Sequence, residues 1–302
     1  MILTVTLNPA VDKTCHINEL MLGQVNRLQS VDSIAGGKGV NVTKVLRQFE
    51  YPVIAMGFLG GYGGKMICDK LTNMGAECHF TYIQGETRVS TNVLAENGYV
   101  TELLEPGPVI SAEELHRFID DYKCQVERVK VVVLSGSIPL GVPQNIYAIL
   151  IMIAKDAGCK VYLDTSGEAL KEGAKAIPHV IKPNRKEMEY LVGRKLATTG
   201  DMVMEAKKLL EAGVEQVIIS LGAKGFIAVD KEGVIEQPVV KVNAVNTVAC
   251  GDCLVASYCM SGLEGKSREE SAKCASVLAA ANATTSVSAE IPMEIYKELL
   301  GL

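Results

Sequence analysis

VKVVVLSGSIPLGVPQNIYAILIMIAKDAGCKVYL, residues 129–163, contains two β-branched runs with a helical stretch between them. Val129–Leu134 and Lys160–Leu163 are short apolar runs of the kind that form strands buried on both faces. Asn145–Ala157 has the length and the apolar content of a helix packed on such a sheet. A strand, a helix and a second strand in this order predict two parallel strands joined by a crossover helix.

The same alternation extends over most of the 302 residues. Further strands are expected at Leu3–Leu7, Val53–Phe58, His179–Lys182 and Gln216–Ser220, and further helices at Gly39–Phe49, Lys65–Asn73, Ser111–Tyr122 and Met202–Glu211. Ser111 with Glu114, and Ser267 with Glu270, have the spacing of helix-capping boxes. The part after Gly251 is mostly helical in pattern. We therefore predict an α/β fold of three layers, in which helices cover both faces of a mostly parallel central sheet.

Extended segments at Lys13–Ile17, Val25–Ile34 and Arg88–Leu104 interrupt this alternation. They are more polar than the core strands, and Asn97-Gly98 supplies a hairpin turn in the last of them. We expect residues of about 12–34 and 86–105 to form a small β-sheet that serves as a lid over the site. The alternative is that these segments are edge strands of the main sheet. No linker or repeat divides the sequence, so we expect a single domain over residues 1–302.

Composition and charge exclude several classes of protein. Hydrophobic residues make up 48% of the chain and charged residues 22%, which is ordinary for a folded globular protein. The net charge of −5 argues against a nucleic-acid-binding or membrane-surface protein, because both need an excess of Lys and Arg. The chain begins with a strand-like run rather than a basic leader, and its nine cysteines follow no disulfide framework. We expect a cytoplasmic protein with reduced thiols.

Two glycine-containing turns can carry chemistry. Gly36–Asn41 joins an extended segment to a helix, and its glycines allow a ligand to approach the backbone, although a tight turn against the sheet would need the same residues. In Asn246–Cys253, a turn at Gly251 precedes a helix whose first amides can hold an anion. Asp252 is placed there to accept a proton from an attacking hydroxyl, or merely to complement the helix dipole.

Two further segments fit a nucleotide site. In Lys182–Glu187, Asn184 and Glu187 have the spacing of a capping pair, but they could also lie near nucleotide phosphates and Mg²⁺. Ser220–Gly225 is a glycine-flanked turn between two strands, which can hold a nucleotide or simply reverse the chain. Spacing alone leaves both alternatives open.

Taken together, these stretches resemble the ribokinase-like (PfkB) carbohydrate kinases, and within them the branch of fructose-1-phosphate and tagatose-6-phosphate kinases. The matching stretches follow the expected order along the whole chain: Thr6–Asp12, Gly36–Asn41, Thr87-Arg88, Ser135–Pro139, Asp164–Gly167, Lys182–Asn184, Ser220–Gly222 and Gly251-Asp252. The resemblance implies a ribokinase-like fold with a β-sheet lid. It implies transfer of the terminal phosphate of ATP to fructose 1-phosphate, or alternatively to tagatose 6-phosphate, with ATP and Mg²⁺ as cofactors.

The resemblance also assigns site residues. Sugar hydroxyls would be held by Asp12, Gly37 and Asn41, and the substrate's own phosphate by Arg27, Lys38 and Arg88, with Ser137 nearby. ATP and its metal would be bound by Lys182, Asn184, Ser220, Gly222 and Gly225, with Asn282 on the adenine side and Glu187 near Mg²⁺. Asp252 would be the general base, and the amides of Ala249, Cys250, Gly251 and Asp252 would form an anion hole for the transferring group.

The sequence departs from the family pattern at this anion-binding turn. The usual Gly-Ala-Gly-Asp is Ala249-Cys250-Gly251-Asp252 here, so Ala249 would be strained if its backbone must be left-handed. Cys250 and Cys253, beside a helix N-terminus, are expected to have lowered thiol pKa values and to react with alkylating reagents. The two cysteines also have metal-pair spacing, but no second pair completes a zinc site.

Two other classes of protein remain as alternatives. One is a non-catalytic sugar-phosphate-binding protein that kept the fold, which the changes at Ala249 and Cys250 would allow. The other is a nicotinamide-dependent dehydrogenase, which needs a glycine pattern after the first strand where this chain has Asn8-Pro9-Ala10. For the kinase we expect a homodimer in which the lids meet, because unpaired strand edges need to be covered.

Overall fold

The computed structural model describes residues 1–301. The central sheet contains β1 (Ile2–Thr6), β4 (Val53–Leu59), β5 (Glu77–Cys78), β6 (Thr81–Tyr82), β9 (Val131–Ser135), β10 (Lys160–Asp164), β11 (Val180–Ile181), β12 (Gln216–Ser220), β13 (Phe226–Asp230) and β14 (Gly233–Gln237). Their order is β14-β13-β12-β11-β10-β9-β1-β4-β5, with β6 paired to β4. Only the β12–β13 and β13–β14 pairs are antiparallel. The predicted mostly parallel sheet is confirmed, and the antiparallel β13–β14 edge is an addition to it.

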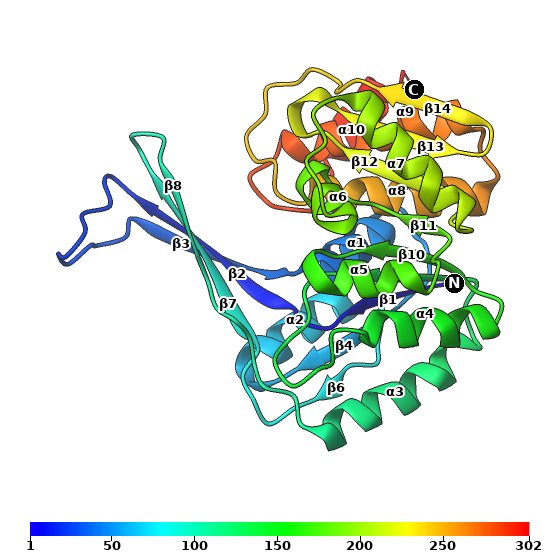
Figure 1. The fold of residues 1–302 in the computed structure, drawn as a ribbon. Helices are drawn as coiled ribbons and strands as arrows, with labels where there is room; N and C mark the ends of the chain where they lie inside the picture. Colours follow the sequence, from blue (N-terminus) through cyan, green and yellow to red (C-terminus); the bar gives the residue numbers. More distant parts are fainter. Residues whose placement is uncertain (302) are drawn as a thin grey trace.

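Strands β1 and β9 are buried on both faces, as their largely apolar, β-branched sequences predict. Leu3 and Leu134 point into one core, whereas Ile2 and Val133 point into the core on the opposite face. Helices α3 (Ala112–Val126), α4 (Ile146–Asp156), α5 (Gly167–Lys175), α6 (Arg185–Val192) and α7 (Thr199–Glu211) contribute to the first core. Helices α1 (Lys38–Gln48), α2 (Gly61–Asn73), α8 (Cys250–Glu264), α9 (Arg268–Ala283) and α10 (Met293–Leu300) cover the other face. The result is three layers (Figure 1).

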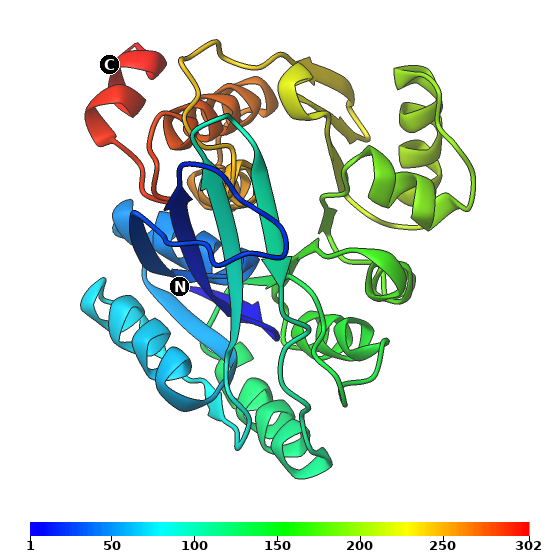
Figure 2. The ribbon, with the colours of Figure 1, turned by 90° about the vertical axis from the view of Figure 1, so that its left-hand side faces the viewer.

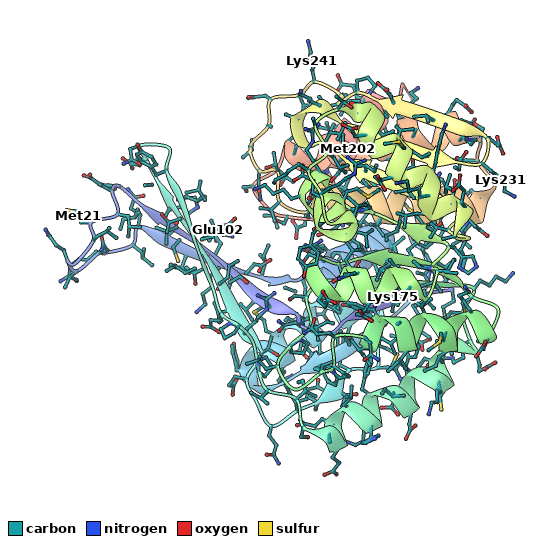
Figure 3. All side chains as sticks on the ribbon, in the orientation of Figure 1. Met21, Glu102, Lys175, Met202, Lys231 and Lys241 are labelled. Atoms are coloured by element: carbon teal, nitrogen blue, oxygen red, sulfur yellow. The ribbon has the colours of Figure 1, made fainter. Side chains whose placement is uncertain are left out.

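A second sheet forms the lid. It contains β2 (Ala10–Ile17), β3 (Ser30–Gly36), β7 (Arg88–Ala95) and β8 (Val100–Leu104) in the order β3-β2-β7-β8. It projects from the body in Figure 1 and faces the viewer in Figure 2, and Met21 lies at its far tip (Figure 3). The predicted separate lid sheet is confirmed, and the alternative of edge strands on the main sheet is wrong.

Local sequence signals also have their expected structures. The capping boxes at Ser111 and Ser267 are both formed, each by a serine and the glutamate three residues later. Gly98 adopts a φ of 85° in the hairpin turn of the lid, which few residues other than glycine tolerate. Within residues 1–301, no helix is long and apolar enough to cross a bilayer.

Candidate active site

A cavity of about 400 Å³ lies where the lid meets the carboxyl ends of the parallel strands. Asp164 is the last residue of β10, Ser220 is the last residue of β12, and the first turns of α1 and α8 face the same space. In open α/β sheets, ligands bind at this edge. The cavity is lined by Asp12, Gly37, Lys38, Asn41, Arg88, Asp164, Lys182, Asn184, Ser220, Val248, Ala249, Gly251 and Asp252. It thus brings together predicted residues from both the sugar side and the nucleotide side.

Asp252 is buried in the first turn of α8 and has one fixed oxygen. Asn41 Nδ2 donates a hydrogen bond of 2.9 Å to Asp252 Oδ2, joining residues from α1 and α8. Burial and the nearby Asp164 carboxylate raise the pKa of Asp252 to about 6, although Lys38 and Asn41 counteract part of the shift. A carboxylate with this pKa is ionised at neutral pH and is a stronger base than an exposed aspartate. The geometry suits a general base.

The turn before Asp252 presents unpaired amides. Within residues 1–301, the backbone N–H groups of Gly251 and Asp252 have no hydrogen-bond acceptor, and Ala249 has no side-chain atom to cap the helix. Ala249 has a φ of 66°, in the left-handed region, as the sequence departure suggests. That conformation costs a non-glycine residue about 1–2 kcal/mol. The strained turn therefore leaves two donors and a helix N-terminus directed at the cavity.

The thiols next to this turn have raised rather than lowered pKa values. Burial raises the pKa of Cys250, and burial together with Cys250 and Asp252 raises the pKa of Cys253 well above its usual value. The expectation of lowered thiol pKa values is therefore wrong. The helix N-terminus favours a thiolate, but desolvation in the apolar layer between α8 and α9 outweighs it.

A buried carboxylate joins two of the predicted cationic residues. Asp164 Oδ1 lies 2.9 Å from Lys38 Nζ and 3.2 Å from Lys182 Nζ, and the Asp164 side chain is fully buried. Burial opposes ionisation of Asp164, but the two ammonium groups outweigh it and lower the pKa of Asp164. Burial would likewise lower the pKa of Lys38, yet Asp164, Glu187 and Asp252 raise it. Asp164 thus holds two lysine side chains at the cavity wall.

Asp164 begins one of the stretches that resemble the kinase family, but the resemblance assigns it no role. Its position directly after a predicted parallel strand was the available signal, because such residues line the ligand edge of the sheet. Asp164 Oδ2 is buried and has no hydrogen-bond partner within residues 1–301. A buried carboxylate oxygen without a partner destabilises the folded state unless a ligand or ion supplies the missing contact.

Asn184 and Glu187 form the capping pair, and Asn184 also lines the cavity. Glu187 N donates to Asn184 Oδ1, and Asn184 N donates to Glu187 Oε2. The other carboxylate oxygen, Glu187 Oε1, lies 3.9 Å from Lys38 Nζ. Asp164 Oδ2 and Glu187 Oε1 are thus two acidic oxygens left over near the cavity. Within residues 1–301 no set of three or more His, Cys, Asp or Glu side chains is gathered to hold a metal. Two carboxylates suit Mg²⁺, which usually keeps waters and phosphate oxygens as its remaining ligands.

The predicted sugar side of the cavity is built from the lid strands and α1. A Cβ at Gly36 would stand 1.9 Å from Asp12 Oδ2, so the glycine makes room for this carboxylate. Burial raises the pKa of Asp12 to about 6, while Lys44 and Arg88 lower it. Arg88 Nε donates to the carbonyl of Asn8, another residue without an assigned role. Asn8 Oδ1 and Asn41 Oδ1 are buried acceptors without partners within residues 1–301, as hydroxyl-binding groups would be.

The remaining predicted residues lie farther from the cavity. Arg27 is exposed in the loop between β2 and β3 and does not line the cavity. Ser137 Oγ accepts a hydrogen bond from Asn8 Nδ2 and so supports the sugar side indirectly. Gly222 and Gly225 have φ values of 60° and 92° and form the turn between β12 and β13.

Asn282 is buried within α9. Its Nδ2 donates to the carbonyl of Val248, and its Oδ1 accepts from Ala289 N. Its side chain is therefore committed to holding the backbone before the anion-binding turn, which differs from the predicted contact with adenine.

Comparisons with known proteins agree with this geometry. A sequence model described as pfkB family carbohydrate kinase matches residues 5–294. A Thermotoga maritima protein described as a possible 1-phosphofructokinase has 30% identity and a TM-score of 0.89, and the match covers 100% of this chain and 97% of that one. Escherichia coli phosphofructokinase-2 in complex with fructose-6-phosphate has 26% identity and a TM-score of 0.89, with 99% and 98% covered. Its tetrameric inhibited form has 27% identity and the same TM-score and coverage. Arabidopsis thaliana ribokinase, with 23% identity, has a TM-score of 0.80 over 100% of this chain and 98% of that one, which confirms the ribokinase-like α/β fold with a four-stranded lid.

Proposed function

The chain belongs to the pfkB family of carbohydrate kinases, and we propose that it phosphorylates fructose 1-phosphate at the 6-hydroxyl to give fructose 1,6-bisphosphate. One observation supports the kinase chemistry above all: the Asp252 carboxylate lies in the same helix turn as the unpaired backbone N–H groups of Gly251 and Asp252. The choice of acceptor is supported by the Thermotoga maritima protein described as a possible 1-phosphofructokinase. Tagatose 6-phosphate, phosphorylated at the 1-position, is the alternative acceptor.

The proposed reaction is an in-line transfer. Asp252 accepts the proton of the attacking hydroxyl through the oxygen that Asn41 leaves free. The Gly251 and Asp252 amides, the positive end of α8 and the Lys182 ammonium stabilise the negative charge on the transferring phosphoryl group. Asp12 and Asn41 accept hydrogen bonds from sugar hydroxyls, and Arg88 and Lys38 bind the phosphate already on the sugar.

ATP is the proposed donor, on the side of the cavity lined by Lys182, Asn184 and Ser220. Mg²⁺ is the proposed metal, and Asp164 Oδ2 and Glu187 Oε1 are the oxygens that would hold it, directly or through water. When bound, the metal neutralises phosphate charge. The lid excludes water from the cavity, so ATP is not hydrolysed without a sugar acceptor.

A panel of sugar phosphates with an ADP-release assay tests the proposal. We expect the largest kcat/KM with fructose 1-phosphate. A larger value with tagatose 6-phosphate would select that activity, and preference for fructose 6-phosphate would make this chain functionally closer to the Escherichia coli relative. Tight binding of a sugar phosphate without any ADP release would select a non-catalytic binding protein.

We also propose a homodimer formed through the lid. The lid and its loop carry exposed apolar side chains, namely Met21, Leu22, Val25, Leu28, Val31, Val100, Leu103 and Leu104. Exposed apolar side chains gathered on one element are typical of a protein–protein interface. A related phosphofructokinase is described as tetrameric. Leu103→Glu should convert the dimer to a monomer in size-exclusion chromatography with light scattering, whereas Met152→Glu, at an exposed position on α4, should not. A monomeric unmodified protein would contradict the proposal. We place the enzyme in the cytoplasm, where its free thiols remain reduced.

A further inference from the structure

Lys44 is a buried lysine that the proposed mechanism does not use. It lies in the second turn of α1, and its side chain is among the largest that are fully buried. Lys44 Nζ donates to the carbonyl of Ala35 at 3.3 Å and to the carbonyl of Ser288 at 2.6 Å. A buried ammonium is costly, so its retention here indicates a specific role for the positive charge.

The two carbonyl groups belong to different parts of the site. Ala35 directly precedes the Gly36-Gly37 turn, beside the Asp12 carboxylate. Ser288 lies in the loop between α9 and α10, 244 residues away from Lys44 in sequence. The Lys44 ammonium therefore ties the sugar-binding turn to the C-terminal loop.

The C-terminal loop is in turn tied to the anion-binding turn. Gln48, one turn after Lys44 on α1, donates to the carbonyl of Ala289 at 2.8 Å. Ala289 has a φ of 59°, and its N–H donates to Asn282 Oδ1. Asn282 Nδ2 then donates to the carbonyl of Val248, the residue before Ala249. Hydrogen bonds joined through the Ser288-Ala289 peptide unit thus connect the proposed sugar-binding turn, through Lys44, to the backbone before the proposed anion-hole amides.

We propose that Lys44 is a positioning residue for phosphoryl transfer: its ammonium acts as an internal cation that holds the sugar-binding turn and the anion-binding turn in register. This inference rests on the proposed kinase function. Misplacement of reacting groups by about 1 Å can cost on the order of 10²-fold in rate, so a tie between the two turns matters for turnover.

The charge on Lys44 also acts on its neighbours. The charged and titratable groups that face it are Asp12 on β2, Lys70 on α2, Cys253 on α8 and Glu290 in the C-terminal loop. Burial lowers the pKa of Lys44 to about 8, while Glu290 and Asp12 raise it and Lys70 lowers it. The ammonium in turn lowers the pKa of Asp12 and so favours the ionised carboxylate that accepts sugar hydroxyls. As the pH rises through about 8, Lys44 loses its charge, and we expect turnover to fall.

Stability should change in the opposite direction over the same range. The folded-state pKa of Lys44 is lower than that of an exposed lysine, so the unfolded chain binds more protons between about pH 8 and 10.5. The contribution of Lys44 to the free energy of unfolding therefore increases with pH in this window. If turnover falls while the contribution of Lys44 to stability rises as the pH increases, the loss of activity cannot be due to unfolding. This combination distinguishes a positioning role for the Lys44 charge from a purely structural role.

The experiment compares Lys44→Met, which keeps the volume, with Lys44→Ala, which leaves space for a small amine. We expect kcat to fall on the order of 10- to 100-fold in both variants. Methylammonium should restore kcat in Lys44→Ala, whereas tetramethylammonium at matched ionic strength should not. Neither cation should restore Lys44→Met. The control Lys65→Met, at an exposed position on α2, should retain the kcat of the unmodified enzyme.

Unchanged kcat and KM in Lys44→Met would overturn the inference. If neither variant folds, the pH profile of the unmodified enzyme decides, because a kcat that stays constant from about pH 7 to 10 would equally overturn it. If the unmodified enzyme phosphorylates no sugar phosphate, the proposed function fails instead. Thermal unfolding of Lys44→Ala then still tests the cation tie, since methylammonium should raise the Tm of this variant alone, and no rise would overturn it.

Discussion

Replacing Asp252 by asparagine should make the protein more stable and almost inactive. The carboxylate is buried beside Asp164, and its pKa is raised from 3.8 to about 6. One pKa unit corresponds to about 1.36 kcal/mol, so the ionised group costs the folded state about 3 kcal/mol above pH 6. The asparagine amide of the variant would keep an acceptor oxygen for Asn41 without this charge.

The sign of the effect follows from proton linkage. Between pH 3.8 and about 6 the folded state retains a proton on Asp252 that the unfolded chain releases, so stability from this group is lost as the pH rises. Roughly half of the penalty is present at about pH 5, and all of it at about pH 8. For 302 residues the unfolding entropy is about 0.6 kcal/mol/K, so the penalty corresponds to roughly 5 °C in Tm at pH 8.

Thermal unfolding and steady-state kinetics together test this reasoning. Asp252→Asn should show a Tm higher by roughly 5 °C at pH 8 and by about half of that at pH 5, with kcat reduced on the order of 10²–10⁴-fold. Asp121→Asn, an exposed position on α3, should change neither quantity. A destabilised Asp252→Asn variant at pH 8 would refute the electrostatic account, and a near-normal kcat would remove Asp252 from the role of base.

Three further predictions concern single side chains. Arg88→Ala should raise the KM for the sugar phosphate roughly 10- to 100-fold and leave the KM for ATP unchanged in steady-state kinetics, and an unaltered sugar KM would show that the phosphate lies elsewhere. Asp164→Asn should destabilise the protein by about 3–5 kcal/mol in denaturant unfolding, because it leaves buried ammonium charge unpaired. It should also shift the acidic limb of the kcat profile, set by Asp252, below about pH 6. Alkylation near pH 7 should modify exposed Cys124 before Cys250, as mass spectrometry of the peptides can show, and inactivation that parallels Cys250 labelling would contradict the raised pKa.

The helices and strands that could be predicted from the sequence are those marked by a pattern within a few neighbouring residues. Buried strands such as β9 and β12 are visible as apolar runs, and the helix starts at Ser111 and Ser267 are visible as capping boxes. The antiparallel strand β14 was not predicted. Its alternation is weak because it is a partly exposed edge strand, and no buried face restricts its composition.

The site was predictable as a set of motifs, but not as a set of contacts. Lys38 was assigned to the substrate phosphate, and the structure pairs it with Asp164, a residue 126 positions away. Asn184 and Glu187 were weighed as either a capping pair or a nucleotide site; the capping bonds are formed, and Glu187 Oε1 lies 3.9 Å from Lys38 Nζ. The pKa of Cys250 depends on how deeply α9 covers it, which no local pattern reveals.

The electrostatics of the cavity depend on the one carboxylate that lies between its two lysines. Lys182 is almost fully buried, and its Nζ lies 3.2 Å from Asp164 Oδ1, the same oxygen that lies 2.9 Å from Lys38 Nζ. Asp164 therefore holds both lysine side chains in place before any phosphate binds. The same negative charge raises the pKa of Asp252 and so strengthens the base. Replacing Asp164 with a neutral residue should therefore release both lysine side chains and lower the pKa of Asp252, the proposed base. A single fully buried carboxylate thus acts on both sides of the proposed reaction, because it holds two lysine side chains and raises the pKa of Asp252 within the same cavity.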